Sequence, residues 1–390
     1  MERYLSLCRV ALKNTIFVIF LAAQIHGFLL SAQRNPSVVV CPTYCVGQDT
    51  CWASSYCRGK SLGMEANAND IATSANQDSD DEAQVFVRNF RQARALPCIY
   101  RCGSTDDIID AIHTSPTNAD VETAEAVLLH RARLVLDLRS PSERDEERAQ
   151  QWMAHAPGGP LSVIDWNDNR DAKFVENERT VLRIDVLSPS RLFSHLESKW
   201  FNPSQRALSA LFYTLDTNKL HELRMDVLNK KGLFGLYEAI LFTSGNELCA
   251  ALQAITICLE SFNHRPESDG AIVVHCVEGK DRTGLVVMLC QSMMGLADEH
   301  IIDDYFQSDK RKKSGSSAAT TALGNQTRGK LDRRAFSGAP REVMISTMAL
   351  IRSEWGSISE YLDSIGFDTS WQERYTKSIH LTTSTIRSNL

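Results

Sequence analysis

One segment constrains this chain more than any other: an apolar strand, a short loop and an apolar helix that follow one another directly. Residues 271–274 (AIVV) have the pattern of a buried strand, and residues 283–294 that of an apolar helix. Five residues separate Cys276 from Arg282 in the loop between them. Such a loop turns successive backbone N–H groups inward, and the start of the helix adds a positive end. The segment therefore predicts an anion-binding cup with a cysteine at its base.

The residue types in this loop favour chemistry on a bound phosphate. Arg282 supplies a planar fork that matches two phosphate oxygens. The positive surroundings favour the thiolate of Cys276, which becomes a nucleophile aimed at the phosphate. A metal site or a thioredoxin-type redox site fits less well, because the loop holds Lys280 and Arg282 and no second cysteine. A buried cysteine in an ordinary strand–helix turn is the remaining alternative.

The loop sequence HCVEGKDRTG resembles the phosphate-binding loop of the cysteine-dependent protein tyrosine phosphatases. It is most similar to the atypical group that includes mycobacterial PtpB and listerial LipA, which act on phosphotyrosine and phosphoinositides. Weaker matches flank it in the family's order, at Asn89-Phe-Arg91, Ile99–Ser104, Asp137-Leu-Arg139 with Glu143, Gly235–Leu241, Ile302–Tyr305 and Gly356–Gly366. The resemblance implies a cysteine-phosphatase-like α/β fold, with a central mostly parallel sheet flanked by helices on both faces. It also implies a phosphoric monoester hydrolase that needs no metal and no cofactor.

The same resemblance implies roles for the loop residues. Cys276 is expected to become the phosphocysteine, and Arg282 to bind the substrate phosphate and its transition state. Thr283 is expected to donate its hydroxyl to the Cys276 sulfur, and His275 to orient the loop through hydrogen bonds. Lys280 is expected to add positive charge at the rim of the site, where it would suit a multiply phosphorylated head group. The expected substrate-binding residues are Val277, Glu278, Gly279, Lys280, Asp281 and Arg282.

The general acid has two candidates. In the atypical group the aspartate inside the loop is the usual choice, which is Asp281 here. Some members carry an aspartate in a Pro-Phe-Pro-Asp-like turn after the second strand. This chain has Ser-Pro-Ser-Arg at residues 188–191, so that alternative requires Asp185 to substitute. No Trp-Pro-Asp segment occurs in the chain, and we expect Asp281 to act as the acid.

The resemblance predicts one catalytic domain over residues 85–375, and short apolar runs predict strands near 134–138, 181–187 and 271–275. A helical stretch over 233–260 is broken near Ser244-Gly245, and helical patterning returns over 342–378. Residues 308–341 form a basic insert with nine Lys and Arg against two Asp, expected to be a flexible loop. Its charge indicates either simple solvation or contact with an anionic membrane. Residues 376–390 are expected to be a disordered tail.

The amino-terminal residues have the layout of a targeting signal. A basic stretch precedes the apolar run 15–23, which predicts a signal peptide or signal-anchor over residues 1–32. Residues 33–84 form a cysteine-rich head and an acidic linker, the latter with six acids and no base over 64–84. We expect delivery to the secretory pathway or endomembranes, with secretion, plastid import or a signal-anchored form as alternatives.

Four cysteines lie close together behind this signal, at Cys41, Cys45, Cys51 and Cys57. Two short disulfides are the expected arrangement in an oxidising compartment. Free thiols remain an alternative, and zinc fits less well because the cluster contains no histidine.

Composition narrows the remaining classes of function. The formal net charge is −6, from 42 Lys and Arg against 48 Asp and Glu, which argues against a basic nucleic-acid binder. The expected partner is a phosphotyrosine protein or a phosphoinositide, with a possible membrane contact through the insert. Two other functions stay open: a phosphate-binding scaffold with weak catalysis, and a binding role centred on the cysteine-rich head.

Overall fold

The computed structural model describes residues 87–144, 148–156, 159–166, 179–263, 270–310, 330–332 and 334–388. The leader over 1–32, the four-cysteine cluster and the acidic linker lie outside these described residues.

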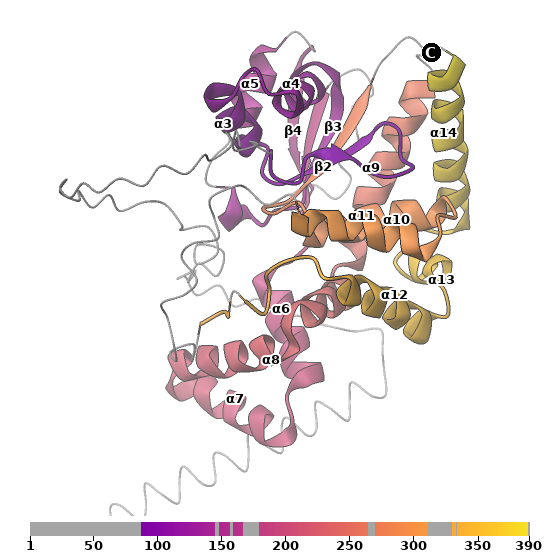
Figure 1. Ribbon diagram of the computed structural model, residues 1–390. Helices are drawn as coiled ribbons and strands as arrows, with labels where there is room; N and C mark the ends of the chain where they lie inside the picture. Colours follow the sequence, from indigo (N-terminus) through magenta and orange to yellow (C-terminus); the bar gives the residue numbers. More distant parts are fainter. Residues whose placement is uncertain are drawn as a thin grey trace, which may run out of the picture. The chain divides into compact units, whose positions relative to one another are not determined.

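The described residues form one mixed sheet with the phosphate-loop strand near its centre (Figure 1). The order is β1-β2-β6-β3-β5-β4, and only β1 is antiparallel to its neighbour. The strands are β1 (Arg91–Gln92), β2 (Ile99–Cys102), β3 (Ala132–Asp137), β4 (Leu161–Asp165), β5 (Arg179–Arg183) and β6 (Ala271–His275). The predicted mostly parallel sheet is confirmed, although β5 ends four residues earlier than expected and β1, β2 and β4 carried no strand prediction.

Side chains of the central strands alternate between two apolar cores. Leu134 and Leu136 of β3 point into one core, while Val135 between them points into the other. In β6, Ile272 belongs to the same core as Leu134, and Val273 belongs to the same core as Val135. Because successive side chains of a strand face opposite sides, this pattern requires cover on both faces of the sheet.

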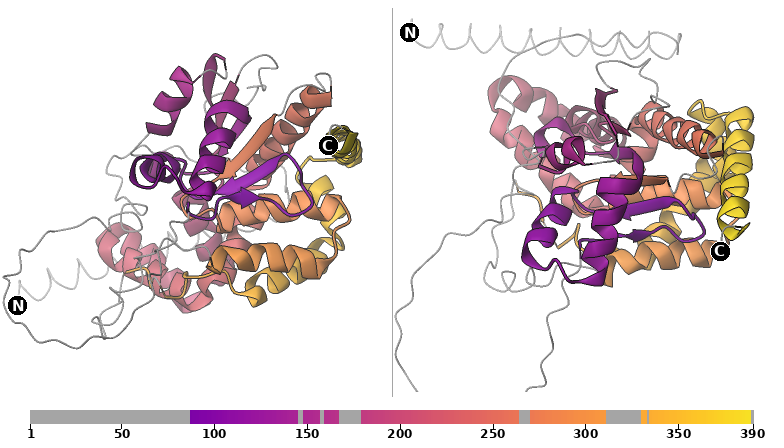
Figure 2. Two further views of the ribbon diagram at one scale, coloured as in Figure 1. Left: turned by 45° about the horizontal axis from the view of Figure 1, so that its top comes forward. Right: turned by 90° about the horizontal axis from the view of Figure 1, so that it is seen from above.

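The smaller core is covered by helices from the first half of the domain. They are α3 (Asp106–Thr114), α4 (Ala119–Glu125), a π-helical segment (Ala126–Arg131) and α5 (Arg148–His155). Their buried side chains, among them Ile108, Val121 and Val127, belong to one apolar cluster with Val135 and Val273 of the sheet. Figure 2 shows these helices gathered beside the strands.

The larger core is formed mainly by helices that follow β5. They are α6 (Pro189–His195), α8 (Thr217–Thr243), α9 (Gly245–Asn263), α10 (Asp281–Met293), α11 (Asp298–Lys310), α12 (Arg341–Trp355), α13 (Ile358–Ser364) and α14 (Thr369–Ser388). Helix α7 (Pro203–Leu215) packs against α8 and contributes no residue to this core. The predicted break near Ser244 separates α8 from α9. A second break within α8 lies at Gly232, whose φ is 61°. No single helix among the described residues is long and apolar enough to span a membrane.

The structure differs from two expectations about irregular segments, although residues 311–329 and 333 of the insert lie outside the described residues. The tail predicted from residue 376 continues α14 as far as Ser388, because Tyr375 and Ile379 lie one turn apart and are both fully buried. Part of the basic insert is also packed rather than solvated. Phe336 and Ala339, within the predicted loop, are buried in the larger core.

Candidate active site

The loop that joins β6 to α10 lies at the carboxyl end of the central strand, where parallel sheets bind their ligands. Gly279 has φ 68°, a conformation that side-chain-bearing residues rarely adopt. A Cβ at this position would lie 2.3 Å from backbone atoms of Cys102. The loop therefore needs glycine for its conformation and for its close approach to β2.

Hydrogen bonds from outside hold three consecutive carbonyl groups of the loop. Ser104 donates its backbone N–H to the carbonyl of Val277 at 3.0 Å. Asn89 donates from Nδ2 to the carbonyl of Glu278 at 2.7 Å. Arg101 donates from Nη2 to the carbonyl of Gly279 at 3.0 Å.

These outward carbonyls determine where the loop N–H groups point. The C=O and N–H of a trans peptide point in opposite directions, so the N–H groups of Glu278, Gly279 and Lys280 turn toward the inside of the loop. The N–H of Gly279 donates to Sγ of Cys276 at 3.3 Å, which agrees with this geometry. The inner surface thus forms a nest of donors around the cysteine.

A buried ion-pair network supports the outside of the loop. Arg101 is 1% exposed and pairs through Nη1 with Oδ2 of Asp304 on α11 at 2.9 Å. Arg91 donates from Nη2 to the backbone carbonyl of Asp304 at 2.6 Å. The sequence matches around Asn89-Phe-Arg91 and Ile302–Tyr305 carried no assigned role, and the structure shows that they brace the catalytic loop.

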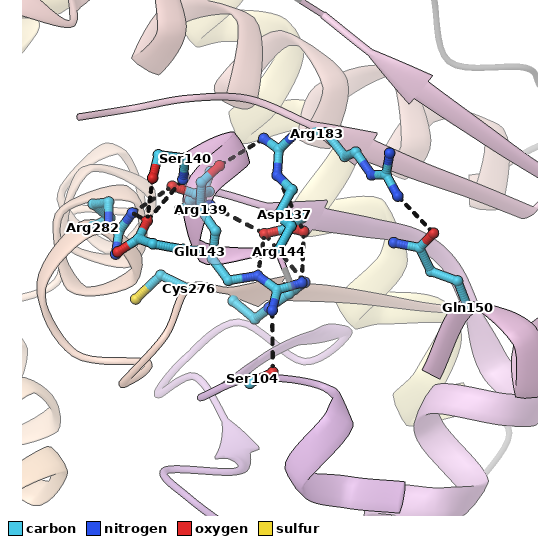
Figure 3. Close-up of polar contacts among 12 residues, drawn as sticks. Ser104, Asp137, Arg139, Ser140, Glu143, Arg144, Gln150, Arg183, Cys276 and Arg282 are labelled. Carbon is cyan, nitrogen blue, oxygen red and sulfur yellow. Dashed lines mark hydrogen bonds and ion pairs between the residues drawn. The ribbon is translucent and has the colours of Figure 1, made fainter. Parts of the chain in front are cut away.

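Arg282 makes a two-point ion pair with Glu143, which follows β3 (Figure 3). Nη1 lies 2.5 Å from Oε2 of Glu143 and Nη2 lies 2.9 Å from Oε1, while Nη1 also donates to the carbonyl of Leu138 at 3.1 Å. These bonds use three of the five guanidinium donors. The remaining donors, on Nε and Nη2, share the edge that matches two phosphate oxygens.

The same ion pair affects the titration of Glu143. Burial alone would raise the pKa of this carboxyl, but the Arg282 charge and hydrogen bonds outweigh burial and hold the pKa below its usual range. Glu143 therefore stays ionised and keeps the guanidinium in place. The sequence match noted Glu143 but assigned it no role.

A second network lies behind the loop and is centred on the fully buried Asp137 at the end of β3 (Figure 3). Arg139 pairs with both carboxylate oxygens, from Nε to Oδ1 and from Nη2 to Oδ2, each at 2.9 Å. Arg144 lies 3.7 Å from Asp137 and continues to Asp165 of β4 at 3.0 Å. This network ties together the ends of β3 and β4, which lie on either side of β5.

His275 belongs to this rear network. Its Nε2 lies 3.8 Å from Oδ1 of Asp137, and the ring is 1% exposed. Burial lowers the pKa of His275 to about 4, despite the opposing charge of Asp137, so the ring is neutral near pH 7. A hydrogen bond with the backbone of Cys276 also opposes this shift, so His275 contacts the first residue of the loop.

Asp281 begins α10 and faces the same pocket as Cys276 and Arg282. The hydroxyl of Tyr237 donates to its Oδ1 at 3.2 Å, and Nζ of Lys280 lies 3.6 Å from the same oxygen. Burial raises the pKa of Asp281, although the charges of Lys280 and Arg282 oppose the shift. A raised pKa favours the protonated form of the carboxyl, which is the form that a proton donor needs.

Two predicted positions differ in the structure. Lys280 does not lie at the rim: it is 4% exposed, and its Nζ donates to the carbonyls of Phe336 at 2.7 Å and Gly338 at 2.8 Å. Thr283 is fully buried, but its hydroxyl forms no hydrogen bond among the described residues. The expected bond from Thr283 to the Cys276 sulfur is therefore not formed.

The pocket above the loop combines a polar base with apolar walls. Its lining residues are Glu143, Leu187, Leu236, Cys276, Val277, Glu278, Asp281, Arg282, Leu331 and Phe336. Over the described parts of the chain, no group of three or more His, Cys, Asp or Glu side chains is placed to hold a metal ion.

A cysteine at the base of an arginine-containing anion nest, at the end of the central parallel strand, defines the class of cysteine-based phosphate-loop proteins. A family model described as "Tyrosine phosphatase family" matches residues 98–379, well over half of the chain. The chain belongs to the tyrosine phosphatase family. The predicted resemblance is confirmed.

Two curated proteins show more limited similarity. One, from Cupriavidus necator, is named "Putative tyrosine-protein phosphatase" and is 29% identical over 121 residues, which are 28% of this chain and 40% of that protein. The other, from Nostoc commune, is named "Tyrosine-protein phosphatase" and is 29% identical over 111 residues, which are 26% of this chain and 36% of that protein. The chain thus matches about two fifths of the length of these relatives.

Proposed function

We propose that this protein hydrolyses phosphomonoesters through a phosphocysteine intermediate at Cys276. One observation carries the proposal: Cys276, Arg282 and Asp281 line one pocket, whose loop N–H groups turn toward the cysteine. Donors and a guanidinium are therefore arranged around the position where a phosphoryl group would meet the sulfur.

The reaction proceeds in two displacements. The Cys276 thiolate attacks phosphorus, the S–P bond forms, and the P–O bond to the leaving group breaks. Asp281 gives its proton to the departing oxygen and becomes a carboxylate. Water then attacks the phosphocysteine while Asp281 takes back a proton, and inorganic phosphate and the thiolate are released. Arg282 and the loop N–H groups stabilise the equatorial oxygens in both steps.

The pocket walls favour an aryl phosphate, and we take a phosphotyrosine protein as the proposed substrate. Leu187, Leu236 and Phe336 offer apolar surface to a flat ring. Lys280, which would have met a second phosphate on an inositol head group, is instead bonded to backbone carbonyls. Both features support phosphotyrosine over a phosphoinositide.

Phosphate release by the purified full chain tests the proposal. We expect turnover of aryl phosphates and phosphotyrosine peptides in the absence of added metal, and weaker turnover of phosphoinositides. Cys276→Ser should abolish turnover while retaining substrate binding, and Arg282→Lys should be severely impaired because lysine lacks the two-point fork. Phosphate binding without turnover by the wild-type chain would favour a scaffold, and full activity of Cys276→Ser would rule out the mechanism.

For cellular location, we propose that residues 1–32 direct the chain into the endomembrane system and that the basic insert contacts anionic membrane. The supporting features are the basic and apolar leader and the excess of Lys and Arg over 308–341. A fusion of residues 1–40 to a fluorescent protein tests the leader, and a uniform cytosolic signal would contradict it. Cosedimentation with phosphatidylserine vesicles tests the contact, which should weaken at high salt.

A further inference from the structure

The chain that leads into α12 forms a strap along the pocket, defined here as residues 330–332 and 334–340. Asn229 on α8 holds one end of the strap: its Nδ2 donates to the carbonyl of Lys330 at 2.8 Å and its Oδ1 accepts from the N–H of Asp332 at 2.9 Å. At the break in α8, the N–H of Leu233 donates to the carbonyl of Ala335 at 3.1 Å. The strap is therefore anchored to the two halves of α8.

Lys280 joins the strap to the catalytic loop. Its Nζ is 2.7 Å from the carbonyl of Phe336 and 2.8 Å from that of Gly338, and it faces Oδ1 of Asp281 at 3.6 Å. Two of the three ammonium donors are used by the strap carbonyls, and the charge of the group faces Asp281 at ion-pair distance. Lys280 is not among the residues that line the pocket with Cys276, so its side chain is directed to the strap rather than to a bound substrate.

The strap supplies part of the pocket wall. Leu331 and Phe336 line the same pocket as Cys276, and Phe336 is only 3% exposed. Leu187 and Leu236 continue this apolar surface from other elements. The part of the pocket beyond the phosphate site is therefore shaped by a segment that Lys280 holds in position.

We propose that Lys280 is a positioning residue that fixes the strap against the catalytic loop, and that Leu331 and Phe336 determine specificity for a flat, apolar leaving group. This inference rests on the proposed phosphatase function and extends it. It assigns the loop lysine to the leaving-group side of the pocket rather than to the substrate phosphate.

Steady-state kinetics of Lys280→Met separate the two roles. The variant removes the hydrogen bonds to the carbonyls of Phe336 and Gly338, the first of them buried, so the wall shifts and KM for an aryl phosphate should rise about tenfold. The inhibition constant of inorganic phosphate should stay within about twofold, because the loop N–H groups and Arg282 are unchanged. A parallel rise of both constants would show that Lys280 binds phosphate directly and would overturn the inference. Lys219→Met, at an exposed lysine of α8, is the matched control.

A double-mutant cycle tests whether Lys280 acts through the strap. Phe336→Ala should raise KM for the aryl ester while sparing an alkyl ester of similar size. Adding Lys280→Met to Phe336→Ala should raise KM little further, since both changes disrupt the same contact between Phe336 and the substrate ring. Fully additive effects, or equal losses on both esters, would contradict the inference.

Two controls keep the outcomes separable. Circular dichroism and thermal melts identify variants that fail to fold, and Leu331→Ala then provides a second test of the wall with Lys280 intact. If the wild-type chain hydrolyses no ester, the proposed function fails. Calorimetric binding of phenyl phosphonate and of inorganic phosphate to the same variants still tests the wall: unchanged phosphonate affinity in Lys280→Met would overturn it.

Discussion

Arg282 and Glu143 meet through two hydrogen bonds, although 139 positions separate them in the chain. The carboxylate occupies the end of the guanidinium, while the carbonyl of Leu138 takes a further donor. The side chain of Arg282 is thereby held with its Nε edge free for two phosphate oxygens. Because the guanidinium is already held in place, the Arg282 side chain loses less conformational entropy when a phosphate binds.

Glu143→Gln should therefore reduce kcat/KM for an aryl phosphate by roughly 10- to 100-fold, a cost of about 1.4 to 3 kcal/mol. The amide can accept only one of the two bonds and carries no charge to fix the arginine. Steady-state assays check this, with Glu122→Gln on the exposed face of α4 as the control. Unchanged kcat/KM would show that Arg282 is oriented without Glu143.

Gly279→Ala should abolish activity and destabilise the domain by roughly 2 kcal/mol or more. The reason is a combination of positive φ and a Cβ 2.3 Å from the Cys102 backbone. Gly295 provides a close match, since its φ is 69° but a Cβ added there would have no neighbouring atom within 4 Å. Gly295→Ala should therefore cost only about 1 kcal/mol, from its backbone conformation alone. Urea unfolding compares the two, and equal losses would show that contact with β2 is unimportant.

Asp281→Asn should slow hydrolysis of alkyl phosphates more than of aryl phosphates with good leaving groups, because alkoxides depend more on a proton donor. Burial raises the pKa of Asp281, and an acid is active only while protonated. In the wild-type chain, kcat should fall as pH rises through this pKa, and the variant should lose that dependence. Equal slowing of both ester classes would instead indicate a structural role beside Tyr237.

Acidification should destabilise the domain through His275, whose folded pKa is lowered to about 4 by burial. An unfolded histidine titrates near 6.5, so between these values the unfolded state binds more protons and stability falls as pH falls. From pH 7 to pH 5 this group alone contributes a loss of about 2 kcal/mol. Asp137, Arg139 and Arg144 face the ring, and the lowered pKa of Asp137 adds to acid sensitivity only at lower pH.

Urea unfolding at pH 7 and pH 5 measures this dependence. His275→Gln should reduce the loss between the two pH values, whereas His380→Gln, on the exposed side of α14, should leave it unchanged. An identical pH dependence in wild type and His275→Gln would mean that another group controls acid stability.

Local patterns were enough to predict the strand–loop–helix unit around Cys276. The apolar run of β6, the glycine in the loop and the apolar α10 are contiguous, so one short segment encodes its own conformation. Period-two alternation was weaker evidence in β2, whose four residues are all buried, and in β4, whose five residues include none that is buried.

The packed strap shows why local composition failed elsewhere. Residues 308–341 are basic and rich in small polar side chains, which predicted a flexible loop. Phe336 is nevertheless buried, since the break at Gly232 and the ammonium of Lys280 provide partners for the strap carbonyls. Composition averages over a segment, whereas burial depends on which partners the rest of the fold presents.

Cys276, Arg282 and the loop between them could be predicted from local sequence, because five intervening residues between an apolar strand and an apolar helix place them in one short loop. Their partners depend on the tertiary structure. Asn89 reaches the loop across 189 positions and Glu143 across 139, and Lys280 turns away from the substrate toward a strap 56 positions later. Contacts at such separations depend on strand order and helix packing, which no local pattern of residues specifies.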